Sequence, residues 1–150
     1  MKVRFVLAAV FVSVFALLVV VPVVHADVQL PAIFSDHMVL QRDSSVPVWG
    51  LAEPGEKVSV SVAGQSQAAK ADDMGKWMVR FDKLKAGEPA TLVVKGKNAI
   101  TINDVLVGEV WLGSGQSNMA FTVQGAIDAD KEKVASDLPR IRMFTESSPS

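Results

Sequence analysis

The sequence has no cysteine among its 150 residues, which excludes disulfide bonds, thiol chemistry, cysteine-ligated zinc and haem attached through cysteine. It also lacks an excess of charge of either sign, since its formal net charge is −1. Binding to nucleic acid requires a basic patch, and the sequence contains none, so no nucleic-acid partner is expected. A small domain without disulfides must be stabilised by the burial of apolar side chains alone.

The first 26 residues have the pattern of a secretory signal peptide. Two basic residues stand near the start, an apolar run over residues 5–21 follows, and Pro22 ends it before a Val-His-Ala sequence. We expect cleavage after Ala26 and export to the periplasm or the cell exterior. The alternative is a retained membrane anchor, because the run is nearly long enough to span a bilayer. Without residues 1–26, 13 basic and 16 acidic residues remain, a net charge of −3, and no membrane association is then expected.

Residues 28–105 alternate apolar and polar side chains with the period of a β-strand. The alternation is clearest in two apolar sets: Val58, Val60 and Val62, and Trp77, Val79 and Phe81. Turn-forming pairs such as Pro54-Gly55 recur about every ten residues, which is typical of an antiparallel sandwich or barrel. We therefore expect residues 27–104 to form a mainly β accessory domain, an antiparallel sandwich of jelly-roll or immunoglobulin-like type.

The pattern changes at residue 105. Residues 105–112 are nearly all apolar, as in a strand buried on both faces of a parallel sheet. Residues 126–138 combine helix-forming and charged residues at the spacing of a short amphipathic helix, and a proline ends it. Residues 141–144 then have the pattern of a further strand. This order of strand, helix and strand predicts that residues 105–150 begin an α/β domain.

Two glycines and a serine follow the apolar run, in the sequence Gly-Ser-Gly-Gln-Ser-Asn-Met over residues 113–119. Glycines permit a sharp turn, and a serine just beyond one can lie among free backbone N–H groups, as a nucleophilic serine requires. A dinucleotide-binding turn would need a third glycine where Asn118 stands. The nucleophile elbow of α/β-hydrolases would need a glycine where Met119 stands. On glycine and serine content alone, a structural turn without chemistry is the remaining alternative.

A longer set of motifs resembles the sialate O-acetylesterase family, a branch of the SGNH hydrolases. The sequence Trp-Leu-Gly-Ser-Gly-Gln-Ser-Asn-Met over residues 111–119 resembles that family's first catalytic block. Its preceding segments are matched, in order, by residues 30–42, 47–50, 53–55, 75–77 and 103–111. Because these matches cover nearly the whole chain after residue 26, the sequence resembles the N-terminal portion of the family. The domain that begins at residue 105 would then have the flavodoxin-like three-layer fold of an SGNH hydrolase.

The resemblance implies an exported serine esterase, a carboxylic ester hydrolase that removes O-acetyl groups from sialic acid or related glycans. Ser117 would be the nucleophile, and its own N–H would contribute to the oxyanion hole. Gly115, Gln116 and Asn118 would support the turn or reach the substrate. The resemblance implies an O-acetylated sugar or glycan as the partner, and neither a cofactor nor a metal.

The resemblance also places the catalytic histidine and aspartate in a C-terminal block that this chain does not contain. These 150 residues would then be an incomplete and inactive form of the enzyme. The one histidine after residue 26 is His37, which we interpret as a structural or surface residue rather than the base. Asp36 precedes His37 and could orient the imidazole ring, but adjacent residues in a strand point to opposite faces. The alternative function is a non-catalytic exported β-sandwich module that binds a glycan or a protein.

The remaining large apolar residues are predicted to be structural. Trp77 and Trp111 are expected in the core, although these and Trp49 could instead stack on sugar rings. Met119 and Phe121 are expected to pack the following helix into the core. An apolar strand without the rest of its sheet would be an aggregation-prone edge.

Overall fold

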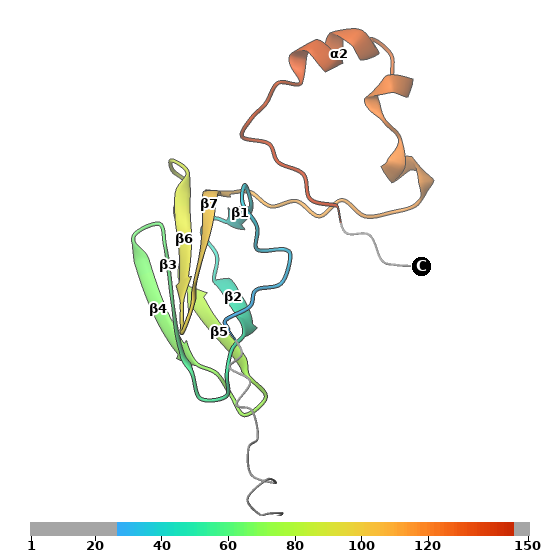
Figure 1. Cartoon of the computed structure of the whole chain (residues 1–150). Helices are drawn as coiled ribbons and strands as arrows, with labels where there is room; N and C mark the ends of the chain where they lie inside the picture. Colours follow the sequence, from blue (N-terminus) through green and yellow to red (C-terminus); the bar gives the residue numbers. More distant parts are fainter. Residues whose placement is uncertain (1–26, 146–150) are drawn as a thin grey trace, which may run out of the picture.

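A computed structural model describes residues 27–145, which form a β-domain (residues 27–108) followed by a C-terminal segment (residues 109–145) (Figure 1). The predicted signal peptide lies outside the described residues. The strands are β1 (Val39–Gln41), β2 (Val46–Leu51), β3 (Lys57–Val62), β4 (Gln65–Lys70), β5 (Lys76–Phe81), β6 (Ala90–Lys95) and β7 (Ala99–Gly108). The C-terminal segment contains the 3₁₀ turns η1 (Ser117–Ala120) and η2 (Val123–Gly125) and the helix α2 (Ala129–Ala135).

The strands form two sheets that share one core. Five strands are ordered β1-β7-β6-β3-β4, and β2 pairs with β5 in a second, antiparallel sheet. Fully buried side chains come from both sheets: Val48, Val58, Val60, Phe81, Leu92, Val94 and Val105. The mainly β architecture predicted from the sequence is confirmed. The prediction of antiparallel pairing is wrong at one place, because β1 lies parallel to β7.

Local sequence explains most of these strands. The predicted alternation places Val58, Val60 and Val62 of β3 in the core, and β5 buries Trp77, Val79 and Phe81 in the same way. Core packing of Trp77 is therefore confirmed. The turn before β5 requires glycine at Gly75, where φ is +77° and a Cβ would lie 2.5 Å from the carbonyl oxygen of Ala52.

The strand predicted over residues 105–112 is wrong in its bounds and its surroundings. The chain forms a single strand from Ala99 to Gly108, which crosses the position where the sequence pattern changes. Val105 and Val107 pack in the core of the β-domain, and β7 is hydrogen-bonded to β6 and β1 rather than to a new parallel sheet. Trp111 is 88% exposed, so its predicted core position is also wrong.

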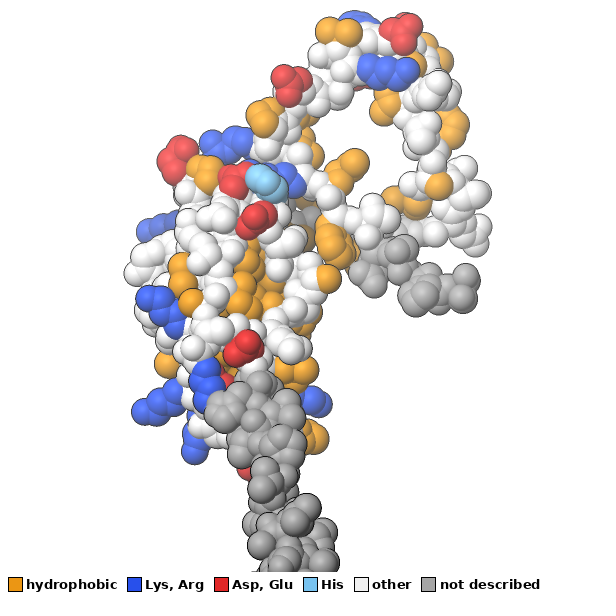
Figure 2. Space-filling view, in the orientation of Figure 1, with side chains coloured by type: hydrophobic (Ala, Val, Ile, Leu, Met, Phe, Trp, Pro, Cys, Tyr) orange, Lys and Arg blue, Asp and Glu red, His pale blue; other side chains and the backbone are white. Residues whose placement is uncertain are grey.

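The C-terminal segment forms an open loop of short helices on one end of the β-domain (Figure 1). The helix predicted over residues 126–138 is confined to Ala129–Ala135, and residues 141–145 form no strand. No residue of the segment is buried, and hydrophobic side chains are visible along it in Figure 2. The layered packing of an α/β domain is thus not formed within residues 109–145. The helices of the described chain are too short to cross a membrane.

Candidate active site

The serine turn follows directly from the end of β7. Residues 109–116 contain no regular element, and η1 then begins at Ser117. Gly115 has a φ of +156°, a value that residues with a side chain rarely adopt. As the first residue of a 3₁₀ turn, Ser117 has an N–H group without an acceptor inside that turn. The sequence therefore places an exposed serine, preceded by a glycine bend, at the start of a helical turn.

The side chain of Met119 lies against this glycine bend. A Cβ added to Gly115 would lie 2.7 Å from Met119 Cγ, and one added to Gly113 would lie 3.3 Å from Met119 Cε. Phe121 lies in the same way against Gly125. Met119 and Phe121 are nevertheless 57% and 66% exposed, so the prediction that they pack a helix into the core is wrong here. Within residues 109–145 there is no core to receive them.

The other predicted site residues lie beside the serine and are exposed. Gln116 and Asn118 make only main-chain hydrogen bonds: Met119 N–H donates to Gln116 O at 2.9 Å, and Phe121 N–H donates to Asn118 O at 3.2 Å. Their amide side chains, like the Ser117 hydroxyl, have no hydrogen-bond partner among the described residues. The turn is therefore held by its main chain and by Met119. All three residues are exposed to solvent.

A first clasp ties the start of the C-terminal segment to β1. The Gln41 side chain accepts a hydrogen bond from Val110 N–H at 2.9 Å and donates one to Glu109 Oε2 at 3.0 Å. The Arg42 main-chain N–H donates to Gly108 O at 2.9 Å, and its Nε lies 3.5 Å from Glu109 Oε1. We call Gln41, Arg42 and Glu109 the entry clasp. It fixes the direction in which the chain leaves β7 toward Ser117.

A second clasp ties the end of the segment to the same end of the β-domain. Asp104 Oδ2 lies 2.6 Å from His37 Nδ1 and 2.8 Å from Arg142 Nη2. Arg142 Nη1 also donates to the Asp104 carbonyl. The hydrogen bond with His37 lowers the pKa of the Asp104 carboxyl most, and the hydrogen bond with Arg142 lowers it further, so this pKa lies below its ordinary value. We call His37, Asp104 and Arg142 the return clasp.

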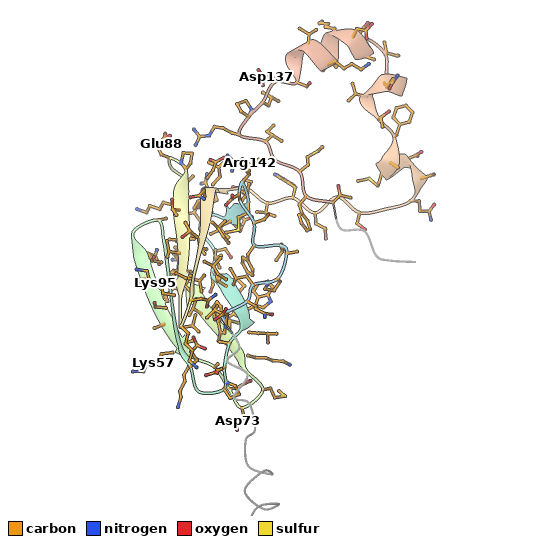
Figure 3. The ribbon with its side chains drawn as sticks, viewed as in Figure 1. Lys57, Asp73, Glu88, Lys95, Asp137 and Arg142 are labelled. Carbon is orange, nitrogen blue, oxygen red and sulfur yellow. The ribbon has the colours of Figure 1, made fainter. Side chains whose placement is uncertain are left out.

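The figures show how the two ends of the segment meet the β-domain. In Figure 2, acidic and basic side chains gather beside a histidine where the segment adjoins the sheets. In Figure 3, Arg142 lies near the upper end of β7, whereas Asp137 projects from the far part of the segment. Arg140 adds a hydrogen bond from Nη2 to Gly87 O at 2.9 Å. The loop that carries Ser117 is therefore anchored at both of its ends and free between them.

The structure brings Gly115, Gln116, Ser117 and Asn118 together as one turn, but it joins His37 to Asp104 rather than to Ser117. Asp36 is likewise engaged elsewhere, because its Oδ1 accepts the Asn103 N–H at 2.6 Å. Sequence reasoning did not identify the two clasps. All of their residues except Arg142 lie within motifs 30–42 and 103–111, and the presence of both motifs was the available signal.

Comparisons with known proteins agree with this assignment of motifs. No family model matches the chain. It is 36% identical over 109 residues to the sialate O-acetylesterase of Mus musculus and 36% identical over 110 residues to that of Homo sapiens. Each alignment covers 65% of this chain, which spans about one fifth (20% and 21%) of those relatives. The fold is similar to a crystal structure of a carbohydrate acetylesterase from Xanthomonas citri, with a TM-score of 0.69 and 40% identity over 73% of this chain and 26% of that one.

Proposed function

We propose that this chain, which is homologous to the N-terminal portion of sialate O-acetylesterases, supplies the nucleophile of an exported serine esterase. The substrates would be O-acetyl esters of sialic acid or of related glycans. The observation that carries the proposal is the position of Ser117, exposed on a glycine bend whose loop is anchored to the β-domain at both ends. The names of the sialate and carbohydrate acetylesterases it resembles support the choice of ester.

In the proposed reaction, Ser117 Oγ attacks the acetyl carbonyl carbon and loses its proton to a base. The ester C–O bond then breaks, the sugar hydroxyl leaves with a proton, and water later hydrolyses the acetyl-serine. The Ser117 N–H, which has no acceptor within η1, is available to the oxyanion. One such donor typically lowers the barrier by about 3 kcal/mol. Gln116 and Asn118 are placed to contact the acetyl group or neighbouring hydroxyls.

The base is proposed to come from outside residues 27–145. Serine needs a neighbouring general base within hydrogen-bond reach, and His37 instead holds Asp104 at the base of the loop. The exposed apolar residues of the segment point to the same conclusion, since such surfaces are normally covered. Trp111, Leu112, Ile127 and Met143 are each at least 88% exposed. We therefore assign the segment as the first part of an SGNH α/β domain, with the β-domain as its accessory domain.

Export is the second part of the proposal. Its support is the sequence of residues 1–26, with a basic start, an apolar run and Pro22 before Val-His-Ala. N-terminal sequencing of the protein recovered from outside the cytoplasm should begin at Asp27. A protein that begins at Met1 and sediments with membranes would instead indicate a retained anchor.

A chimeric enzyme tests the esterase proposal directly. Residues 27–145 would replace the aligned part of the Xanthomonas citri carbohydrate acetylesterase, which would supply all other groups. We expect the chimera to hydrolyse an aryl acetate and Ser117→Ala to lower kcat by a factor on the order of 10⁴ or more. Ser114→Ala is the matched control, because Ser114 is an exposed serine three residues away, and it should remain about as active as the parent. A folded chimera whose activity survives Ser117→Ala would contradict the proposal.

A further inference from the structure

A cavity on the β-domain lies away from the serine turn. It is open to solvent, has a volume of about 600 Å³ and is lined by residues 29–31 together with parts of β2 and β5 and the end of β4. Cavities of roughly 300–1,000 Å³ with apolar walls and a few polar groups are typical of sites for small organic ligands. Neither Ser117 nor either clasp lines it. The cavity is thus a separate feature from the candidate active site.

One wall of the cavity carries an exposed and braced indole ring. Trp49 is 36% exposed on the outer side of β2, opposite Met78 of β5. Phe34 packs against it edge-on, with ring centroids 4.8 Å apart and an interplanar angle of 78°. This arrangement is a favourable aromatic pair and fixes the plane of the indole. A fixed aromatic face beside Leu30 and Pro31 suits the flat apolar side of a sugar ring.

Two lysines and one aspartate form the charged part of the cavity lining. Lys70, Asp72 and Lys76 line the cavity, but Asp72 Oδ1 already accepts the main-chain N–H groups of Met74 at 2.9 Å and Lys76 at 2.8 Å. Neither lysine forms an ion pair with any carboxylate of residues 27–145. Charged hydrogen bonds from ammonium groups to a carboxylate are among the stronger polar contacts. The lining therefore combines an apolar wall with two lysines suited to an anion.

An unpaired donor provides an independent indication of a ligand site. Trp77 lines the cavity from the core side and is 3% exposed. Its Nε1 is buried and has no hydrogen-bond partner among the described residues. Buried donors are nearly always paired, and leaving one unpaired costs free energy.

We propose that this cavity is a binding site for a sugar that bears a carboxylate. The sugar ring would pack on Trp49, and its carboxylate would accept hydrogen bonds from Lys70 and Lys76. Sialic acids and hexuronic acids share this chemistry. The site does not use Ser117, so it goes beyond the proposed esterase activity and can fail or succeed independently of it.

Titrations of the chain followed by the indole N–H signals in two-dimensional NMR test the proposal. The probes are methyl α-sialoside, methyl β-glucuronide and the neutral methyl β-glucoside. We expect at least one acid to give saturable shifts of the Trp49 and Trp77 signals, with a Kd about tenfold lower than that of the glucoside. Shifts with one acid and not the other would identify which acid the site takes. Equal affinity for the glucoside, or no saturation with either acid, would overturn the proposal.

Matched variants locate the site. Lys70→Gln combined with Lys76→Gln should raise the Kd of the acid about tenfold, to that of the glucoside. Lys85→Gln combined with Lys95→Gln should leave it unchanged, because neither of these exposed lysines lines the cavity (Lys95 is labelled in Figure 3). Trp49→Ala should abolish saturation, Trp49→Phe should retain it, and Trp111→Ala should have no effect. Loss of binding in Trp111→Ala or in the Lys85 and Lys95 variant would place the ligand elsewhere and contradict the proposal.

Discussion

The β-domain and the C-terminal segment both contain large apolar side chains, but only the β-domain buries them. Phe81 and Trp77 are 0% and 3% exposed, whereas Phe121 and Trp111 are 66% and 88% exposed. The difference lies in the partners: each strand of the β-domain has hydrogen-bonded neighbours and a facing sheet, and the segment has neither within residues 109–145. Apolar composition alone therefore does not produce a core. The segment is attached by polar clasps at its ends instead.

The largest expected effect is a difference in the free energy of unfolding between two phenylalanine variants, one in each region. Phe81→Ala removes a fully buried ring from the shared core and should lower the free energy of unfolding by about 3–5 kcal/mol. Phe121→Ala removes an exposed ring and should change it by about 0.5 kcal/mol or less. Urea unfolding followed by far-ultraviolet circular dichroism measures both. Equal losses from the two variants would show that the segment contributes to the same cooperative unit as the β-domain.

A smaller effect is expected from two glycines of the β-domain that share one backbone conformation. Gly64 and Gly75 both have φ of +77°, so alanine at either position should cost about 1–2 kcal/mol of stability. At Gly64 a Cβ would meet nothing within 4 Å, but at Gly75 it would lie 2.5 Å from Ala52 O. Gly75→Ala should therefore cost about 1–3 kcal/mol more than Gly64→Ala. Chemical denaturation measures the stability of both variants. Equal free energies of unfolding would contradict the expected difference between Gly75→Ala and Gly64→Ala.

The β-domain could be predicted from the sequence where its structure depends on neighbours along the chain. The alternation of apolar and polar residues in β3 and β5 identified their buried faces, and glycine-containing pairs such as Pro54-Gly55 identified the turns. The parallel pairing of β1 with β7 could not be predicted in this way, because it joins Val39 to Leu106 across most of the domain. The end of β7 was misplaced for the same reason. Residues 110–112 are apolar and extend the strand-like pattern, but β7 ends at Gly108, where Gln41 and Arg42 form hydrogen bonds to Val110 N–H and Gly108 O.

The candidate site shows the same limit. The glycine bend and Ser117 lie within one short motif, so the sequence predicted them together, and the turn is formed locally by Met119 and main-chain hydrogen bonds. The entry and return clasps join residues 38 to 69 positions apart, and no local period signals such contacts. The positions of exposed side chains such as Trp111 depend on what packs against them, which is not a property of the local pattern.

The smallest expected effect concerns the return clasp and leaves the β-domain intact. The pKa of the Asp104 carboxyl is held below its ordinary value of 3.8, mainly by the hydrogen bond with His37 and then by Arg142. A lowered pKa in the folded state means that the carboxylate stabilises the attached segment fully above pH 3.8, and that this contribution is lost as the pH falls through the lower folded value. Between pH 7 and pH 5 the Asp104 carboxyl stays ionised, so its titration should cause no change in the NMR amide signals of residues 140–145.

Asp104→Asn should detach the segment at neutral pH. Asparagine tolerates the φ of +54° at this position, so the main chain of β7 is preserved while the charge is removed. At pH 7 the variant should move the Arg142 signals toward those of an unstructured chain and speed proteolysis within residues 109–145, with the unfolding midpoint of the β-domain unchanged. Asp137→Asn is the control, because Asp137 projects from the same segment without an ion pair to any described residue (Figure 3). If both variants behaved like the parent, the Asp104 carboxylate would not hold the segment, and its attachment would rest on the entry clasp and on the hydrogen bonds of Arg140 and Arg142 to main-chain carbonyls.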